Sequence, residues 1–401
     1  MDREVDVLII GGGPAGLAAG IVCGRNGLRT MVCEKRALPA DKACGEGLMP
    51  TGVAYLERLG VKQRIQQYFP FEGIRYFSPK GRTAGGAFRE GAGWGIPRLE
   101  LSWALLQEAL KLNSLEICAE EQATPIQIEG ANENKWLWAK VGKDYVRTRL
   151  LIGADGLNSV VRRWTGLEGP RCHPRRWGIR QHFQITPWSR DVDVYWSNGL
   201  EAYITPCGEN LVCVAFLWDR KYLPHLPGGD KLFQTLLEYF PSLKKRLSNI
   251  LISDSALAMG PMQRKVVQPV ADGVLLIGDA AGYLDALSGE GISLALAQAL
   301  CLEKTVVPFL LASGRKGILS AVNLSAYKQA HQAITRPYYQ MTNLLLWLSH
   351  HPNLVEQAIR LLAHQPALFQ ALLSANMGLI PLWQAPYVAS AKAIAPRKAV
   401  S

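Results

Sequence analysis

The first 34 residues limit the folds open to this chain more than any other segment does. Residues 6–10 are almost wholly apolar, as expected of a strand buried on both faces of a parallel sheet. Gly11, Gly13 and Gly16 follow at the spacing G-x-G-x-x-G. In this motif the first glycine permits a tight turn, the second lets a pyrophosphate approach the backbone, and the third lets the next helix pack closely on the strand.

A helix and an acidic residue complete the pattern. The helix begins around Pro14 and Ala15, and its N-terminus directs unpaired N–H groups toward a phosphate. Glu34 ends the second apolar run, where a carboxylate can accept hydrogen bonds from a ribose diol, and Lys35 follows it. Because strand, turn, helix, strand and acid occur in this order, the sequence predicts a dinucleotide-binding unit.

The composition is that of a folded protein and excludes several classes. Of 401 residues, 48% are hydrophobic and 19% are charged, which provides a large core and argues against disorder. The eight cysteines show neither C-x-x-C nor zinc-ligand spacing, so we expect reduced thiols, a cytoplasmic location and no metal site. We expect no signal peptide, and since there is no uninterrupted apolar run of about 18 residues, we expect at most a peripheral membrane contact.

Part of the net charge of +11 lies in one stretch. Six arginines occur between residues 162 and 180: Arg162, Arg163, Arg171, Arg175, Arg176 and Arg180. We expect a solvated connector here; the alternative is a basic surface for an anionic lipid, a phosphorylated cofactor or an acidic carrier protein. Nucleic acid is not an expected partner, because no nucleic-acid-binding motif accompanies the charge.

The remaining elements follow from periodicity and from turn residues. We expect a loop at 35–50, helices at 51–67, 96–112 and 230–247, a hairpin at 73–88, strands at 135–141, 144–151 and 273–277, and a sheet within 178–216. From residue 292 onward the pattern is mostly helical. Breaks are predicted at Pro337, Pro352 and Pro366, with a helix stop near Gly378.

Three separated motifs resemble those of the FAD-dependent oxidoreductases that include aromatic-ring hydroxylases and geranylgeranyl reductases, proteins similar to the group A flavoprotein monooxygenases. The first motif is the opening glycine turn with Glu34. The second is Asp155-Gly156, which Ser159 and Arg162 complete, and the third is Gly278-Asp279 within GVLLIGDAAGYLDALSGEGI. Their joint occurrence is far more specific than any one of them.

This resemblance implies an α/β fold in which a Rossmann-type FAD-binding domain is interrupted by a β-sheet substrate domain and followed by a C-terminal helical segment. The FAD-binding domain would comprise residues 1–72, 96–168 and 266–318, the substrate domain residues 73–95 and 169–265, and the helical segment residues 319–401. FAD is the implied cofactor. With a single dinucleotide motif in the chain, NAD(P)H would bind only transiently as electron donor.

The resemblance also assigns cofactor-binding residues, which in the opening motif are Gly11, Gly13, Pro14, Ala15, Gly16, Glu34 and Lys35. Asp279 would bind a ribitol hydroxyl of FAD, and Arg98 would contact the FAD phosphates. The segment Gly289, Glu290, Gly291 and Ile292 would begin a helix whose amides face the flavin and stabilise its reduced, anionic form. Asp155 would support the glycine turn and the cofactor cleft, or serve a structural role alone.

Departures from the family motifs bear on the reaction. Ring hydroxylases usually carry a histidine and a proline where this chain has Gly282 and Ala286, whereas residues 42–47, KACGEG, resemble the K-x-C-G loop of the reductases. The reductases' aromatic substrate strand reads EAYITP here, residues 201–206, keeping the proline and replacing the aromatics around it. The W-x-W-x-I-P motif of flavin-dependent halogenases is missing. The loop therefore favours a reductase, while the strand does not favour its usual substrate.

No catalytic residue can be assigned from the sequence, but three are candidates. Cys44 would tune or protect the flavin, or be a small buried loop residue; His182 and Tyr203 lie on strands expected to face the substrate. We expect Lys42 and Glu46 to be solvated. Aromatic residues of the sheet would line a hydrophobic cavity with half of their side chains: Trp177, Phe183, Trp188, Tyr195, Trp196 and Tyr203.

The function predicted first is a monooxygenase that uses NAD(P)H and O2 to hydroxylate a lipophilic aromatic or polyketide-like substrate. The alternative is a reductase that saturates isoprenoid double bonds. A third possibility, which is not an enzyme, is a protein that binds flavin without turnover. The helical tail would add an apolar lid, contact a membrane surface, or pack against the core.

Overall fold

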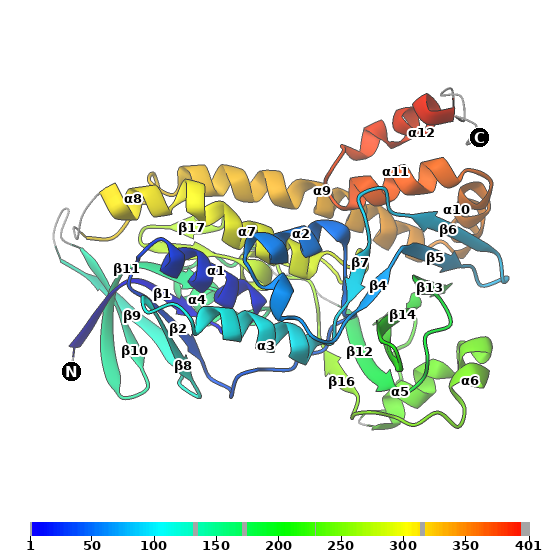
Figure 1. Cartoon of the computed structure of the whole chain (residues 1–401), viewed down its shortest axis with the longest axis horizontal. Helices are drawn as coiled ribbons and strands as arrows, with labels where there is room; N and C mark the ends of the chain where they lie inside the picture. The colour runs from blue at the N-terminus through cyan, green and yellow to red at the C-terminus, as the bar shows by residue number, and fades with distance from the viewer. Residues whose placement is uncertain (1, 131–134, 171–174, 229, 313–316, 394–401) are drawn as a thin grey trace.

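A computed structural model describes residues 2–130, 135–170, 175–228, 230–312 and 317–393. The chain has the predicted α/β fold, with one sheet at each end of the molecule and a long helix lying over both (Figure 1). Arg171 lies outside the described residues. The seven cysteines within them form no disulfide.

The first sheet is the Rossmann-type sheet that the opening motif predicts. Its strands run in the order β17-β18-β11-β1-β2-β8, parallel from β18 to β8, and the hairpin β9-β10 extends it beside β11. Because β1 pairs with β2 on one side and β11 on the other, the glycine turn lies at the centre of the carboxyl edge. The strands are β1 (Asp2–Ile10), β2 (Thr30–Glu34), β8 (Leu115–Ala119), β9 (Ala123–Glu129), β10 (Trp136–Val141), β11 (Asp144–Gly153), β17 (Val270–Ala271) and β18 (Val274–Leu276).

Helices cover this sheet and supply its core. Helix α1 packs between α3 and α7, and its buried face joins an apolar cluster with Ile9, Val32 and Leu296. Helix α3 starts at Arg98 and α7 starts at Gly291, so both begin at the edge of the sheet where the motifs meet. These helices are α1 (Pro14–Arg25), α2 (Pro50–Arg58), α3 (Arg98–Ala109), α4 (Val160–Trp164), α7 (Gly291–Thr305) and α8 (Val307–Ala312).

The second sheet has seven strands in the order β16-β12-β15-β14-β13-β5-β6. One face packs on α5 and α6 through a core that includes Phe216, Phe233 and Phe240. Its strands and helices are β5 (Gly73–Phe77), β6 (Thr83–Ala87), β12 (Arg176–Phe183), β13 (Asp191–Ser197), β14 (Leu200–Gly208), β15 (Leu211–Asp219), β16 (Leu257–Met259), α5 (Asp230–Leu237) and α6 (Pro241–Leu247). A small sheet of β3 (Gly47–Leu48), β7 (Gly93–Gly95) and β4 (Phe69–Phe71) lies between the two large ones.

The C-terminal helices lie on the other side of the second sheet, where the second and third of them pack on β6 and the last packs on the third. They are α9 (Ser325–Ser349), α10 (Pro352–His364), α11 (Pro366–Asn376) and α12 (Ala385–Ala393), and α9 is the long orange helix along the top of Figure 1. The predicted breaks at Pro352 and Pro366 are confirmed, and Gly378 adopts φ +73° just after α11. The break at Pro337 is wrong: α9 continues through it because Tyr327, Tyr338 and Met341 bury its face.

Two other helix predictions need correction. Residues 230–247 form two helices, since Pro241 starts α6 and disfavours helical geometry in the residue before it. The helix expected at 51–67 ends at Arg58, and Gly60 with φ +65° follows. Among the described residues one stretch, Gly291–Ala312, is long and apolar enough to cross a membrane, and half of its most apolar window is buried inside the molecule.

Three of the six clustered arginines are buried, so the prediction of a solvated connector is wrong for them. Arg162 donates to the carbonyls of Ala280 and Leu157, and so joins the second motif to the third. Arg176 and Arg180 form buried ion pairs in the second sheet. Their charges are neutralised internally, whereas Arg163 and Arg175 remain exposed.

Candidate functional site

A cavity of about 860 Å3 starts at the carboxyl edge of the first sheet and continues between the second sheet and the C-terminal helices. Most of the predicted cofactor-binding residues meet there, although they come from distant parts of the sequence. Those that line it are Gly11, Gly13, Pro14, Ala15, Glu34, Lys35, Arg98, Asp155, Gly278, Asp279, Gly289, Gly291 and Ile292. Gly16 and Glu290 do not line it.

The three opening glycines have different surroundings. Gly11 has φ +115°, and a Cβ there would lie 2.3 Å from the carbonyl oxygen of Ala154. A Cβ on Gly16 would lie 1.8 Å from the carbonyl oxygen of Gly11, so this position lets α1 pack on the strand rather than contact a ligand. A Cβ on Gly13 would meet nothing within 4 Å. The open side of the turn at Gly13 therefore faces the cavity.

Glu34 supports the turn from the end of β2. Its carboxylate accepts hydrogen bonds from the backbone N–H of Gly12, at 2.9 Å, and of Arg36, at 3.1 Å. The side chain is buried, yet it lines the cavity. This position fits a carboxylate that also accepts from a ligand hydroxyl, and the ribose contact stays a prediction.

Among the buried polar atoms without a partner within the described residues, Arg98 Nε and Asp155 Oδ1 belong to predicted cofactor-binding residues that line the cavity. Asp155 uses its other oxygen to cap α4, accepting from the N–H of Val160 at 2.6 Å. A buried donor and a buried acceptor left unpaired are costly unless a ligand pairs with them. Both roles suggested for Asp155 are therefore compatible with its surroundings.

Lys42 is not the solvated charge that the sequence suggested. Its ammonium group lies 3.1 Å from the carboxylate of Asp279, and both side chains line the cavity. The pair joins the Cys44 loop, defined here as residues 41–47, to the 3-10 helix η3 (Gly278–Ala281). A polar ligand entering between these segments meets one positive and one negative group.

The N-terminus of α7 lies at the same cavity. Gly289 adopts φ +71° and lines it together with Gly291 and Ile292. Glu290 instead is buried and accepts from the Asn376 amide at 3.3 Å; burial raises its pKa to about 8, against a hydrogen bond from Ser293 that lowers it. The start of α7 therefore fits an anionic ligand. The side chain of Glu290 supports this helix start and does not itself line the cavity.

Of the three catalytic candidates, Cys44 and Tyr203 line the cavity and His182 does not. The backbone N–H of Glu46 donates to the Cys44 sulfur at 3.3 Å. Burial raises the pKa of the Cys44 thiol, although the nearby charge of Arg98 opposes the rise. Tyr203 donates its hydroxyl to the carbonyl of Leu287 at 2.9 Å, which fixes its ring.

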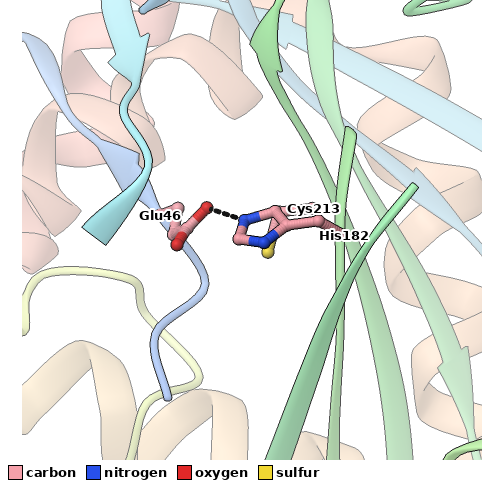
Figure 2. Close-up of side chains that lie close together, drawn as sticks. All are labelled: Glu46, His182 and Cys213. Atoms are coloured by element: carbon pink, nitrogen blue, oxygen red, sulfur yellow. Dashed lines mark hydrogen bonds and ion pairs between the residues drawn. The ribbon is translucent and has the colours of Figure 1, made fainter. Parts of the chain in front are cut away.

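His182 instead contacts Glu46, which is buried rather than solvated as expected (Figure 2). Burial alone would lower the pKa of His182, but hydrogen bonds to Asp254, Cys213 and Glu46 outweigh it and raise the pKa to about 12. The imidazole is therefore charged at neutral pH, between two carboxylates. It does not line the cavity but contacts two residues that do, Glu46 and Arg180.

Beyond the Cys44 loop the cavity becomes an apolar arm between the second sheet and the C-terminal helices. Alternation along the strands sends Trp196 and Tyr203 toward it, whereas Trp177, Phe183, Trp188 and Tyr195 belong to the core on the opposite face. The arm is lined by Ile74, Tyr76, Val192, Val194, Trp196, Leu345, Leu348, Ile359, Leu362, Phe369 and Leu372. An apolar lining of this extent fits a lipophilic ligand.

A buried group of charges fixes the loop between η3 and α7. The guanidinium of Arg176 lies 2.7 Å from Glu201 and 3.0 Å from Asp285, and all three side chains are buried. Asp285 in turn accepts from the N–H of Leu287, and its own carbonyl accepts from the Tyr338 hydroxyl. The second sheet and α9 thus hold the loop that carries Asp279 and Gly289.

The glycine turn, the acid that follows β2 and the unpaired buried polar atoms together fit a phosphate-containing dinucleotide. A family model described as an FAD binding domain matches residues 4–217 of the 401. The chain belongs to this FAD-binding family. The predicted cofactor FAD is confirmed at this level, and the protein is an FAD-dependent oxidoreductase.

Relatives of this FAD-binding oxidoreductase include reductases of isoprenoid lipids. A digeranylgeranylglycerophospholipid reductase of Methanosarcina acetivorans is 28% identical over 72% of this chain and 71% of its own. A second such reductase, from Methanococcoides burtonii, is 25% identical over 98% of this chain and 94% of its own. A menaquinone reductase of Mycobacterium tuberculosis is 26% identical over 74% and 75% of the two chains.

Solved structures share the fold across almost the whole chain. A flavoprotein/dehydrogenase of Cytophaga hutchinsonii aligns with TM-score 0.79 at 18% identity, covering 96% of this chain and 95% of its own. A flavin-dependent brominase aligns with TM-score 0.78 at 18% identity, covering 98% of each chain. A geranylgeranyl bacteriochlorophyll reductase-like protein of Thermoplasma acidophilum aligns with TM-score 0.78 at 17% identity, covering 98% and 99%. At these identities the likeness concerns the fold alone.

Several residues that complete the site have no motif to reveal them in the sequence. Asp254, which bonds both the backbone and the ring of His182, lies 72 positions away on a segment without any motif. Asn376 reaches the cavity from α11, and its Oδ1 atom has no partner within the described residues. The buried carboxylate of Glu46 had one weak signal in the sequence, which is that an acidic residue directly follows Cys44-Gly45 in the loop.

Proposed function

We propose that this oxidoreductase reduces carbon–carbon double bonds in the isoprenoid chain of a lipid, with FAD as resident cofactor and NAD(P)H as transient electron donor. The observation that carries this proposal is the apolar arm, which leads from the Cys44 loop along aliphatic side chains of α9 and α10. A polyprenyl chain suits such a lining because it buries apolar surface along its whole length and needs no polar partner. The digeranylgeranylglycerophospholipid and menaquinone reductases among the relatives support the same class of reaction.

FAD, when bound, would take a hydride from NAD(P)H and deliver it to one carbon of the double bond. The other carbon requires a proton, and Cys44, which lines the cavity where the arm begins, would supply it. Burial raises the pKa of this thiol, so it carries its proton at neutral pH. Solvent then returns a proton to the thiolate, and the substrate has gained two hydrogen atoms while NAD(P)H has become NAD(P)+.

The outer end of the arm suggests how a lipid enters. Leu344 on α9 and Leu361 on α10 line the cavity and are nevertheless 40% and 48% exposed. Trp347, one turn after Leu344, is also exposed. We infer that this end rests on a lipid surface, which lets a prenyl chain pass from the bilayer into the arm without crossing water.

A second candidate function is the monooxygenase that the sequence predicted first. The observation that favours it is an aromatic group in the arm, where the ring of Tyr76 lies 5.6 Å from Trp196 and 4.9 Å from Phe369, measured between ring centroids. Such a group suits a flat, lipophilic aromatic substrate. Oxygen uptake that matches substrate consumption would support this function, and turnover without oxygen would exclude it.

Narrowing the arm tests the reductase proposal. Ala358 lines the arm on α10, and the preceding residue, Gln357, is exposed on the same helix and does not line the cavity. Ala358→Trp would fill the arm, so kcat/KM for a geranylgeranyl substrate would fall by at least about ten-fold, or about 1.4 kcal/mol. A short dimethylallyl substrate and NAD(P)H-driven flavin reduction would change little. Gln357→Trp is the matched control and would leave both substrates unaffected.

Two results would contradict the proposal. If Ala358→Trp lowers turnover of the long and the short chain equally, the arm does not hold the chain. If the wild-type protein converts no prenyl substrate anaerobically but consumes oxygen with an aromatic substrate, the monooxygenase function replaces it.

A further inference from the structure

The Cys44 loop is held by a row of side chains that crosses three strands of the second sheet. Thr205 on β14 pairs with Cys213 on β15, which pairs with His182 on β12, so the three side chains share one face. Thr205 donates to the carbonyl of Gly45 at 2.8 Å, and the Cys213 thiol lies 3.8 Å from the carbonyl of Cys44. His182 Nε2 lies 2.5 Å from the Glu46 carboxylate.

Glu46 connects this row of side chains to the part of the cavity where the predicted cofactor residues lie. Its carboxylate bonds His182 with one oxygen and accepts from the backbone N–H of Arg98 with the other, at 2.8 Å. Its own N–H donates to the Cys44 sulfur. Its φ of +59° is a conformation that residues other than glycine seldom adopt without support from their surroundings. Glu46 therefore joins the thiol through its backbone N–H, and the start of α3 and the sheet through its buried carboxylate.

His182 is anchored from behind by Asp254. The Asp254 carboxylate accepts from the backbone N–H of His182 at 2.9 Å and lies 2.9 Å from its Nδ1. Arg180, two residues earlier on β12, bonds Asp254 and Asp41. Both ring nitrogens of His182 thus face carboxylates, which matches an imidazolium ion held between two anions.

We propose that Glu46, His182 and Asp254 form a positioning chain that sets where the Cys44 thiol and the N-terminus of α3 lie at the FAD site. This inference applies whether the enzyme reduces double bonds or hydroxylates its substrate, so it does not rest on the reductase proposal. His182 is a positioning residue here because it does not line the cavity and contacts the loop through Glu46.

Several of these side chains are also of the types that bind metal ions. Glu46, His182 and Cys213 offer ligand atoms within 4.8 Å of one another, and the Cys207 thiol lies 3.5 Å from Glu46. However, Glu46 and His182 bond each other directly, which leaves no space for an ion between them. The guanidinium of Arg180, 4.0 Å from Glu46, adds a positive charge beside the group. The geometry therefore points to a closed hydrogen-bonded chain.

His182→Asn tests the positioning role through the chemistry of Cys44 in FAD-free protein. Alkylation of the Cys44 peptide by iodoacetamide, followed against pH by mass spectrometry, reports both the exposure and the pKa of this thiol. Because burial is the main cause of the raised pKa, a displaced loop would move the alkylation midpoint toward that of an ordinary thiol. We expect a shift of about one pH unit, hence about ten-fold faster modification at neutral pH. The dissociation constant of FAD would rise in parallel.

Control variants separate this role from plain destabilisation. His350 also pairs with an aspartate, Asp219, but does not line the cavity, so His350→Asn would leave the Cys44 profile unchanged. Glu46→Gln combined with His182→Asn would add little to His182→Asn alone, because both act through one chain. If His182→Asn does not fold, Asp254→Asn carries the test, since it keeps the bond between His182 and Glu46 and would give a smaller shift in the same direction.

Two outcomes would overturn the inference. One is a His182→Asn protein with lowered thermal stability but a wild-type alkylation profile and wild-type FAD affinity. The other is about one equivalent of zinc in the purified wild-type protein that is lost in His182→Asn, which would make the group a metal site.

Discussion

Replacement of Arg176 by methionine tests how the second sheet holds the cofactor loop. Methionine keeps much of the length of the arginine side chain but removes the charge that Glu201 and Asp285 share. Since Asp285 lies on the loop between Asp279 and Gly289, the substitution would loosen the segment that carries two predicted cofactor residues.

The expected cost follows from the burial of both acids. Removing one partner of a buried ion pair leaves its counter-charge uncompensated and typically costs about 3–5 kcal/mol. Burial already raises the pKa of Glu201 from 4.5 to about 7, although Arg176 lowers it. Without Arg176 the pKa of Glu201 would rise further. A carboxyl whose folded-state pKa is raised costs stability as pH rises above its unfolded pKa, so the variant would lose stability steeply between about pH 5 and about pH 8.

Urea unfolding of Arg176→Met and wild type, each at about pH 5 and about pH 8, measures this difference. Because wild-type Glu201 itself ionises near pH 7, the extra loss of the variant would appear mainly above that pH, by as much as about 1.4 kcal/mol for each further pH unit. Arg175→Met is the matched control, because Arg175 is exposed, and it would stay within about 0.5 kcal/mol of wild type. An Arg176→Met protein within about 1 kcal/mol of wild type at both pH values would refute the reasoning.

Three further predictions follow from the same geometry. Gly13→Ala would leave the unfolding free energy nearly unchanged but weaken FAD binding, because its new methyl group points into open cavity. Gly16→Ala would instead unfold more readily, because its Cβ would overlap the glycine turn. Fluorescence titration with FAD and thermal melts compare the two variants. Glu290→Gln would become more stable relative to wild type as pH rises from about 5 through about 8, because the raised pKa of Glu290 makes its ionised form costly. Thermal melts measure this difference, and melting temperatures of the two proteins that change in parallel with pH would disprove it. Leu344→Asp combined with Leu361→Asp would reduce cosedimentation with phosphatidylglycerol vesicles; unchanged binding would place the lipid contact elsewhere.

The cofactor end of the molecule could be predicted from the sequence because its physical requirements are local. A tight turn, a close helix and an acid after the second strand each need a particular residue at a fixed spacing, as Gly11, Gly16 and Glu34 illustrate. The resemblance to the FAD-dependent oxidoreductases also implied that the three motifs belong together. The structure brings Arg98, Asp155 and Asp279 to one cavity, while their individual contacts with FAD stay predictions.

Charged residues without a motif were the difficult part, because burial and pairing are set by distant segments. Arg176 and Arg180 looked like surface charges, and only the sheet shows the acids that neutralise them. Glu46 and His182 lie 136 positions apart, and no spacing rule connects them. Pro337 was expected to end a helix because its ring disfavours one locally, yet packing of α9 outweighs that cost.

An anaerobic single-turnover experiment tests most directly whether this flavoprotein reduces isoprenoid double bonds. The purified protein, saturated with FAD and reduced with one equivalent of NADPH, is mixed with a geranylgeranyl lipid while flavin absorbance is followed and the lipid is analysed by mass spectrometry. We expect oxidised flavin to reappear as the lipid gains two hydrogen atoms. A flavin that stays reduced until oxygen is admitted, with an unchanged lipid, would contradict it.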